Sequence, residues 1–445
     1  MRSLFFIMVV IGMGPLSSLA EERSLTLEEA LQIARKNNPS IQMGRENASA
    51  AEQRVSQAEA GYWPSGTAQL SYKRATANNA PAPDVPSAML SSVGSSLFRD
   101  TNDSYNNFSA LVGVSHPIWD FGRTPGQVAA ARAQVSGAKG DLSSTLDNVL
   151  LSVNRAYFGL LASHERLTLA QETQKQRERH LAYAQAQFQA GTRQKIDVTR
   201  AQADLAQAKL LLVQADNGIR LANLDLGTVM GDPEASQHPY HVSQPEESAE
   251  SLPTSLESAV ADALSRRPEG VIQKARMAEA EAHLRVIRSG YYPALEANGS
   301  VAYGGYEFNK DHARTNWNVG LSATWRFFTG FSTPHAVSEA EASMRVLQAA
   351  SKSLDLSIRR EVEGAWLTYQ EAREKRLPAQ ALLDAGTETL SLAEKRYHTG
   401  LGNIVEVTDA QTLYLQASVG LIQIKFEREI ARAALQKALG LINKG

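Results

Sequence analysis

The chain has 445 residues, of which 43% are hydrophobic and 21% are charged, and its formal net charge is −2. This composition can bury a core and excludes a fully disordered chain, and the small net charge gives no reason to expect nucleic-acid binding. The absence of cysteine excludes disulfides, thiol catalysis and cysteine-ligated metals.

Residues 1–20 have the pattern of a secretory signal peptide. Arg2 supplies the positive charge, Leu4–Met13 the apolar stretch, and Ser18-Leu19-Ala20 the small residues of a cleavage site. The apolar stretch is shorter than the roughly 20 residues that a membrane-spanning helix needs. No later segment is apolar enough either, so a chain that crosses a membrane must here do so with strands.

The remaining sequence contains one pattern twice. The spacing between the copies is 229 residues in their first part and 209 in their second, and the difference falls on a polar, proline-rich loop at 78–84 of the first copy. The matching segments are Leu27–Leu31 with Leu256–Val260, Gly61–Pro64 with Gly290–Pro293, Thr124-Pro125 with Thr333-Pro334, and Gly191 with Gly400. We therefore predict repeat 1 at 21–231, a linker or equatorial segment at 232–255, and repeat 2 at 256–445.

Each repeat predicts a helix, two strands, a very long helix, a tight turn and a final helix. In repeat 1 the strands are expected at 62–75 and 106–119, the long helix at 125–190 and the final helix at 196–230; the counterparts in repeat 2 are 293–306, 315–328, 334–399 and 404–441. Thr124 and Thr333 are the predicted N-caps, each followed by proline, and Gly191 and Gly400 end the long helices. At 1.5 Å per residue, each long helix would extend over roughly 100 Å.

The strands and the final helices differ in their hydrophobic period. Apolar residues such as Val319 and Leu321 alternate with polar residues such as Asn318 and Ser322, which is typical of outer-membrane strands with one face to lipid and one to a lumen. The final helices repeat apolar residues in steps of three and four, which predicts a coiled coil. Four strands cannot close a barrel, and an open edge in lipid costs several kcal/mol per unpaired backbone group, so we expect the chain to oligomerise.

Aromatic residues gather where the strands meet the helices, as they do at the two surfaces of a membrane. The candidates for contact with the membrane interface are Tyr62, Trp63, Trp119, Tyr291, Tyr292, Phe327 and Phe328, with Phe121 and Phe331 beside them. A soluble β-sandwich is the alternative reading of the alternation. A secreted coiled-coil spacer without channel activity would explain the helices but not the paired strand blocks.

Taken together, these segments resemble the TolC-like outer-membrane efflux protein family over nearly the whole mature chain. The resemblance rests on the duplicated opening segment, the Gly-Tyr-aromatic-Pro motif before each strand pair, and the turns at Ala190-Gly191-Thr192 and Thr399-Gly400-Leu401. It implies an α+β membrane protein: a homotrimer with four strands per subunit in a 12-stranded outer-membrane barrel, continued by a periplasmic α-helical tunnel. It also implies docking to a periplasmic adaptor and an inner-membrane pump of the RND or ABC type.

The resemblance also places candidate functional residues just after the two turns. It implies a periplasmic aperture near Asp197, Tyr397, Glu406 and Asp409, and adaptor docking at the turns that contain Gly191, Thr192, Gly400 and Gly402. Gly402 stands where the family pattern has a basic residue, and Arg193 is the candidate for the missing partner. Acids repeated three times around a narrow axis would favour cations; the alternative is that they are first-turn acids, favourable at any helix start.

No motif for catalysis or for a cofactor is found. His238 and His241 supply two imidazoles, whereas a metal site usually needs three or four ligands. We therefore expect no enzyme activity, metal or cofactor, but an outer-membrane exit duct of an efflux or type I secretion system. The sequence does not identify the cargo.

Overall fold

The structure is a computed structural model that describes residues 25–76, 104–233, 239–245, 253, 255–305 and 313–443. The predicted signal peptide at 1–20, the loop at 78–84 and His238 lie outside the described residues. The chain divides into two compact units. Met43–Ser144 and Arg267–Ile358 form the sheet unit, and Met1–Gln42, Thr145–Arg266 and Arg359–Gly445 form the helical unit.

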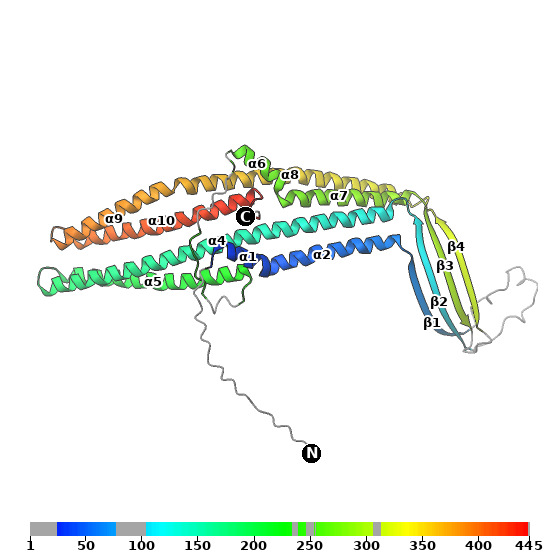
Figure 1. Cartoon of the computed structure of the whole chain (residues 1–445), viewed down its shortest axis with the longest axis horizontal. Coiled ribbons are helices and arrows are strands. Elements are labelled where there is room, and N and C mark those ends of the chain that lie inside the picture. Colours follow the sequence, from blue (N-terminus) through cyan, green and yellow to red (C-terminus); the bar gives the residue numbers. More distant parts are fainter. Residues whose placement is uncertain are drawn as a thin grey trace, which may run out of the picture. The chain divides into compact units, whose positions relative to one another are not determined.

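The sheet unit contains four antiparallel strands that lie side by side in chain order (Figure 1). They are β1 (Ser65–Thr76), β2 (Ser104–Trp119), β3 (Ala294–Gly305) and β4 (Arg314–Thr324). In the middle of the sheet Val112 faces Val301, which in turn faces Trp317. The register of β2 and β3 shifts between Pro117 and Trp119, at a proline that has no N–H for the ladder.

Two strand ends differ from the prediction. The first strand was expected from residue 62, but Ala60–Tyr62 form a 3-10 turn (η1) and β1 begins at Ser65. The fourth strand was expected to reach residue 328, but it ends at Thr324, which pairs with Ala294. Pro293 precedes Ala294 and cannot donate a hydrogen bond, so the ladder stops there and residues 325–328 leave the sheet.

Helices approach each other closely in the sheet unit because small residues lie at their contacts. Helix α2 (Pro39–Glu59) precedes η1 and β1, and α7 (Pro268–Arg288) with the 3-10 turn η3 (Ser289–Tyr291) precedes β3. Gly140, on the long helix α4, lies against α7: a Cβ atom added to it would lie 2.7 Å from a side-chain carbon of Ile272. A larger residue there would force the two helices apart.

The long helices begin differently from the prediction, in which Thr124 and Thr333 were the N-caps. Helix α4 (Arg123–Gln189) is capped by the Asp120 carboxylate, which accepts from the backbone N–H of Thr124 at 2.7 Å. Helix α8 (Ser332–Glu374) is capped by the Thr329 hydroxyl, which accepts from the N–H of Thr333 at 3.3 Å. The prediction was wrong because the chain turns just before each helix, so the capping side chain lies four residues before the threonine.

Each of these turns contains two successive residues with positive φ, and one of the two is phenylalanine. They are Phe121 (φ 51°) and Gly122 (φ 92°) before α4, and Gly330 (φ 61°) and Phe331 (φ 63°) before α8. A left-handed conformation is unfavourable for phenylalanine. Phe121 stacks on the ring of Tyr292 at 4.9 Å, a contact that compensates part of this strain.

The helical unit contains the C-terminal parts of α4 and α8 together with α1 (Leu27–Asn37), α5 (Lys195–Met230), α6 (Leu256–Arg266), α9 (Arg376–His398) and α10 (Ile404–Ala438). Tight turns join α4 to α5 and α9 to α10 (Figure 1). Gly191 (φ 75°) and Gly400 (φ 78°) provide the left-handed residue of each turn. In both turns the N–H groups after the helix return to its last carbonyls in the 6→1 and 5→2 pattern of a Schellman motif.

The second long helix is not continuous, contrary to the prediction of one helix at 334–399. It is interrupted at Lys375, between α8 and α9. Pro378 explains the break, because it has no N–H to donate to the carbonyl of Glu374 and its ring crowds that carbonyl. At this position α4 has no proline and continues without interruption over its 67 residues.

Burial follows the predicted coiled-coil seam. Ala201, Ala208 and Leu226 on α5 are buried, as are Val407 and Leu435 on α10. Leu25 also forms a parallel bridge with Val242, which ties the start of the helical unit to the segment 239–245. Among the described residues, no helix has the combination of length and apolar character that spanning a membrane requires.

Candidate functional site

Arg193 connects the two turns of the helical unit. Its guanidinium lies 4.6 Å from the centre of the Tyr397 ring, in a cation–π contact. It also donates hydrogen bonds to the backbone carbonyls of Tyr397, at 3.1 Å, and of Gly402, at 3.3 Å. One side chain from the α4–α5 turn therefore contacts both the end of α9 and Gly402, near the end of the α9–α10 turn.

Tyr397 is almost completely buried. It packs with Leu390, Ala393, Ile404 and Val407, and its hydroxyl has no hydrogen-bond partner in the described part of the chain. Burial raises the pKa of Tyr397, and the nearby Asp197 carboxylate adds to this. Arg193 and Tyr397 thus form a packed contact rather than a pair of ionised groups.

The three candidate acids occupy different environments. Asp197, in the first turn of α5, is buried. Glu406 and Asp409 are exposed on the first turns of α10, where the Asn403 side chain caps the helix by accepting from the N–H of Glu406 at 2.9 Å. Of these three acids, Glu406 and Asp409 are the two that present carboxylates to solvent.

Arg193, the residue predicted as the basic partner of these acids, contacts Tyr397 and Gly402 instead, and within this chain Glu406 has another basic partner. That partner is Arg396, whose Nε lies 3.3 Å from the Glu406 carboxylate. Gly402 faces the same pair, and a Cβ atom added to it would lie 3.0 Å from Cβ of Arg396 and 3.1 Å from a carboxylate oxygen of Glu406. Arg396 thus occupies the space that a basic residue at position 402 would need.

A buried polar cluster lies next to Tyr397, and the sequence analysis missed it. Its members are the buried Arg177 and His180 on α4 and Gln411 on α10, together with the half-buried Asp204 on α5 and Thr408 on α10. The Thr408 hydroxyl donates to Asp204 at 3.2 Å, and Arg177 lies 3.8 Å from the same carboxylate. No motif marks these residues, because they come from three helices and follow no common period.

The predicted docking turns are hydrogen-bonded helix ends. The Thr192 hydroxyl donates to the carbonyl of Gln187 at 2.9 Å and contacts the amide of the same residue. In the other turn, Leu401 next to Gly400 exposes three quarters of its surface. The exposed residues of the two turns include Gly191, Thr192, Gln194, Thr399, Gly400, Leu401 and Asn403, whereas Gly402 is buried.

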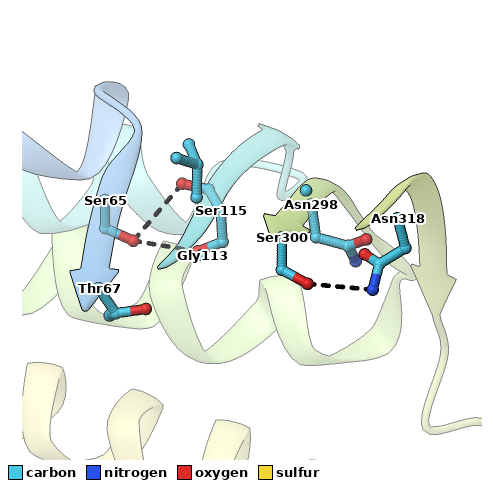
Figure 2. A pocket seen from close by; sticks show the side chains of 9 residues that line it. Ser65, Thr67, Gly113, Ser115, Asn298, Ser300 and Asn318 are labelled. Atoms are coloured by element: carbon cyan, nitrogen blue, oxygen red, sulfur yellow. Dashed lines mark hydrogen bonds between the residues drawn. The ribbon is translucent and has the colours of Figure 1, made fainter. Parts of the chain in front are cut away.

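The sheet unit has one apolar and one polar face. The side chains of the apolar face are highly exposed, with relative exposures of 85% for Leu70, 80% for Val319 and 75% for Trp317. Figure 2 shows the opposite face, where side chains of serine, threonine and asparagine line a shallow hollow. These groups bond across the strands: Ser65 with Ser115 at 3.0 Å, and Asn318 with Ser300 at 3.0 Å (Figure 2).

The aromatic residues predicted at the membrane interface lie at the end of the sheet that adjoins the helices. More than two fifths of the surface is exposed in each of the predicted residues, Tyr62, Trp63, Trp119, Tyr291, Tyr292, Phe327 and Phe328, and also in Phe121 and Phe331 beside them. The Trp325 indole adds to this set and donates to the carbonyl of Tyr291 at 3.0 Å. Phe327 and Phe328 lie beyond the end of β4, not within a strand as predicted.

Within the described residues, no group of three or more histidine, aspartate or glutamate side chains is arranged to hold a metal ion.

Comparisons with known proteins agree on one family. A family profile described as outer membrane efflux protein matches residues 30–232 and 259–441. The pyoverdine export outer membrane protein OpmQ of Pseudomonas aeruginosa is 22% identical over 390 residues, which cover 84% of this chain and 81% of that protein. Protein CyaE of Bordetella pertussis is 26% identical over 369 residues, covering 79% and 75%.

Solved structures show the same fold. The CmeC outer membrane channel of Campylobacter jejuni superposes with a TM-score of 0.79 at 18% sequence identity, over 99% of this chain and 94% of that one. The structure of CusC, described in terms of transmembrane channel formation, gives 0.79 at 16% identity over 93% and 92%. The predicted fold class, with long helices and four strands per chain, is thereby confirmed.

Proposed function

The chain belongs to the outer membrane efflux protein family, and from this premise we propose that it is the passive exit duct of an export system whose energy is supplied by an inner-membrane pump. Its relatives are outer-membrane efflux components, and its location is the outer membrane. The observation that carries the proposal is the two-faced sheet: an exposed apolar face suits lipid, and the uncharged polar hollow of Figure 2 suits a water-filled lumen. We assign no catalytic role to any residue.

The working form that we propose is a homotrimer. Strands β1 and β4 each have one edge without a partner among the described residues. In lipid such edges leave backbone groups unsatisfied, and about eight strands is the smallest barrel that closes. Three copies joined from β4 to β1 would give 12 strands and no free edge.

The proposed partners are a periplasmic adaptor and an inner-membrane pump of the RND or ABC type. The turns at Gly191-Thr192 and Gly400–Gly402 are the candidate docking points. Gly191 and Gly400 are exposed there and the Leu401 side chain adds an apolar contact for an adaptor, whereas Gly402 is buried against Arg396. The relative OpmQ is named as an outer membrane protein of pyoverdine export.

Glu406 and Asp409 are the proposed charge filter at the periplasmic mouth, with Arg193, Tyr397 and Asp197 as the packed layer behind it. Both acids are exposed in one chain, and threefold symmetry would repeat each of them around one axis. Glu406 is partly compensated by Arg396, so Asp409 would contribute the larger share of the field. The opposing reading, helix-start acids without a role in conduction, predicts no effect of their removal on ion preference.

The mass of the protein in detergent and its conductance in a planar bilayer test the proposal together. A stable complex of three chains that conducts ions is expected, because closure needs three sheets. A monomer in detergent would refute the architecture, and a trimer without conductance would refute the channel. If the protein were instead a secreted coiled-coil spacer, it would be extracted without detergent. That alternative does not account for the exposed apolar face of the sheet.

A further inference from the structure

The buried polar cluster beside Tyr397 has no part in the proposed passage of cargo. His180 is 9% exposed, and its Nε2 atom has no hydrogen-bond partner in the described part of the chain. Arg177, three residues earlier on α4, is equally buried, and its Nη1 atom has no hydrogen-bond partner among the described residues. Buried polar groups are usually hydrogen-bonded. Here, among the described residues, Arg177 Nη1 has an ion pair with Asp204 at 3.8 Å but no hydrogen bond, and His180 Nε2 on the same helical turn has no hydrogen bond either.

Charged and titratable groups approach His180 from every packed helix. Those that act on it are Arg177 on α4, Asp204 on α5, and Glu394 and His398 on α9. Its ring lies 5.3 Å from the ring of Tyr397, also on α9. The cavity that His180 lines has a volume of about 650 Å³, and its other titratable groups are Glu172, Lys175, Arg179, Tyr183 and, on α10, Tyr414.

The acids near His180 are already engaged. Asp204 accepts from Thr408 and faces Arg177, and Glu394 accepts from the amide of Gln176 at 2.8 Å. A proton on His180 would therefore place a second buried cation beside Arg177 without a carboxylate of its own. Burial, and then the charge of Arg177, lower the pKa of His180, against the opposing effects of Asp204 and Glu394.

We propose that His180 is an acid-sensitive switch in the packing of the α9–α10 hairpin against α4, and that its protonation loosens this hairpin. In the loosened state the imidazole reaches water and has its ordinary pKa of about 6.5, whereas the packed state binds the proton only at lower pH. Packing is therefore fully favoured above about pH 6.5 and weakens as the pH falls toward the pKa of the packed state. At pH 5.5 the opening equilibrium rises by up to about tenfold.

The consequence for the channel rests on the proposed function. Tyr397 and Arg193 hold the two turns together, and Tyr397 lies against His180. Loosening α9 would release this contact, so acid would mobilise the periplasmic mouth. The change in packing itself is measured without any current, which separates the two claims.

Hydrogen–deuterium exchange of the full chain in detergent tests the switch. Protection factors for peptides of α9 are compared at pH 7.5 and pH 5.5, with peptides of α7 as the internal reference. The wild type should lose up to about tenfold protection in α9 at the lower pH. His180→Gln should show the same protection at both pH values, and His283→Gln, which removes an exposed histidine of α7, should keep the wild-type response.

A second variant keeps the test decisive if His180→Gln does not reach wild-type protection at pH 7.5. Arg177→Gln removes the neighbouring cation, so the packed and loosened states should bind the proton at more similar pH and the acid response should shrink. Equal α9 protection of the wild type at the two pH values would overturn the switch. So would an unchanged acid response in Arg177→Gln or in a folded His180→Gln protein. Loss of conductance with the exchange pattern intact would count against the channel alone.

Discussion

Replacing Val319 by arginine would place a charge at the centre of the apolar face of the sheet. Val319 is the sixth of the 11 residues of β4, it is 80% exposed, and Gly299 is its partner on β3. Eleven residues at about 3.3 Å each, tilted by about 40°, span a height of roughly 28 Å, close to the 25 Å apolar band of outer-membrane barrels. In the proposed barrel Val319 would thus lie near the midplane of the membrane.

The cost follows from that depth. Arginine on the lipid face at the midplane costs about 2–4 kcal/mol per chain, and three copies in one assembly would bring about 6–12 kcal/mol. Ser322→Arg is the matched control, three residues along the same strand but on the opposite face. It lies opposite Glu296 of β3, whose carboxylate can pair with the new guanidinium, so we expect a change within about 1 kcal/mol.

The assay is the yield of detergent-stable trimer from isolated outer membranes, followed by urea unfolding after reconstitution into vesicles. Val319→Arg should lower both the yield and the unfolding midpoint, and Ser322→Arg should leave both near the wild type. Equal losses in the two variants would mean that the lipid and lumen faces have been assigned wrongly. A larger loss for Ser322→Arg would reverse the assignment.

Three further outcomes follow from the turns and helix ends. Glu406→Gln combined with Asp409→Asn should weaken cation preference and leave trimer formation intact. An unchanged reversal potential in a salt gradient would show that neither acid lines the constriction. Asp120→Ala should lower the free energy of unfolding by about 1 kcal/mol through loss of the α4 cap, and chemical denaturation would detect it. Gly231→Ala should lower the free energy of unfolding more than Gly191→Ala, although both glycines have positive φ. The reason is that a Cβ atom at 231 would lie 2.6 Å from the backbone of α1, whereas one at 191 would meet nothing in the described part of the chain. Equal losses would show that the backbone conformation alone decides.

The sequence predicts the parts of the fold that a repeating physical constraint produces. In a sheet between lipid and water, apolar and polar side chains must alternate along each strand. The faces of Val319 and Asn318 can therefore be assigned from the sequence alone. A tight reversal after a helix needs a left-handed residue, so Gly191 and Gly400 mark the turns. The fourth strand was predicted to extend through residues 325–328, which is too far, because alternation alone does not show where its partner strand begins.

Features that arise from one local contact were beyond the sequence reasoning. Asp120 caps α4 across a double left-handed turn, and the Thr-Pro pair after it imitates an ordinary helix start. Arg396 pairs with Glu406 across a hairpin, a contact that no motif encodes. His180 is a single buried histidine on a helix with many charged residues, so its burial has no periodic signal. The roles of the candidate aperture and docking residues remain predictions.

The serine and asparagine side chains of the sheet's polar face have a consequence for transit. Ser65 bonds with Ser115, Ser71 with Ser109, and Asn318 with Ser300, so many of these groups satisfy one another across the strands. A molecule that moves along such a wall finds few unsatisfied donors or acceptors to hold it, and conduction requires that each stop be brief. The lining would then bind chemically different cargoes only weakly. Selection among cargoes would therefore depend on the component that loads the duct.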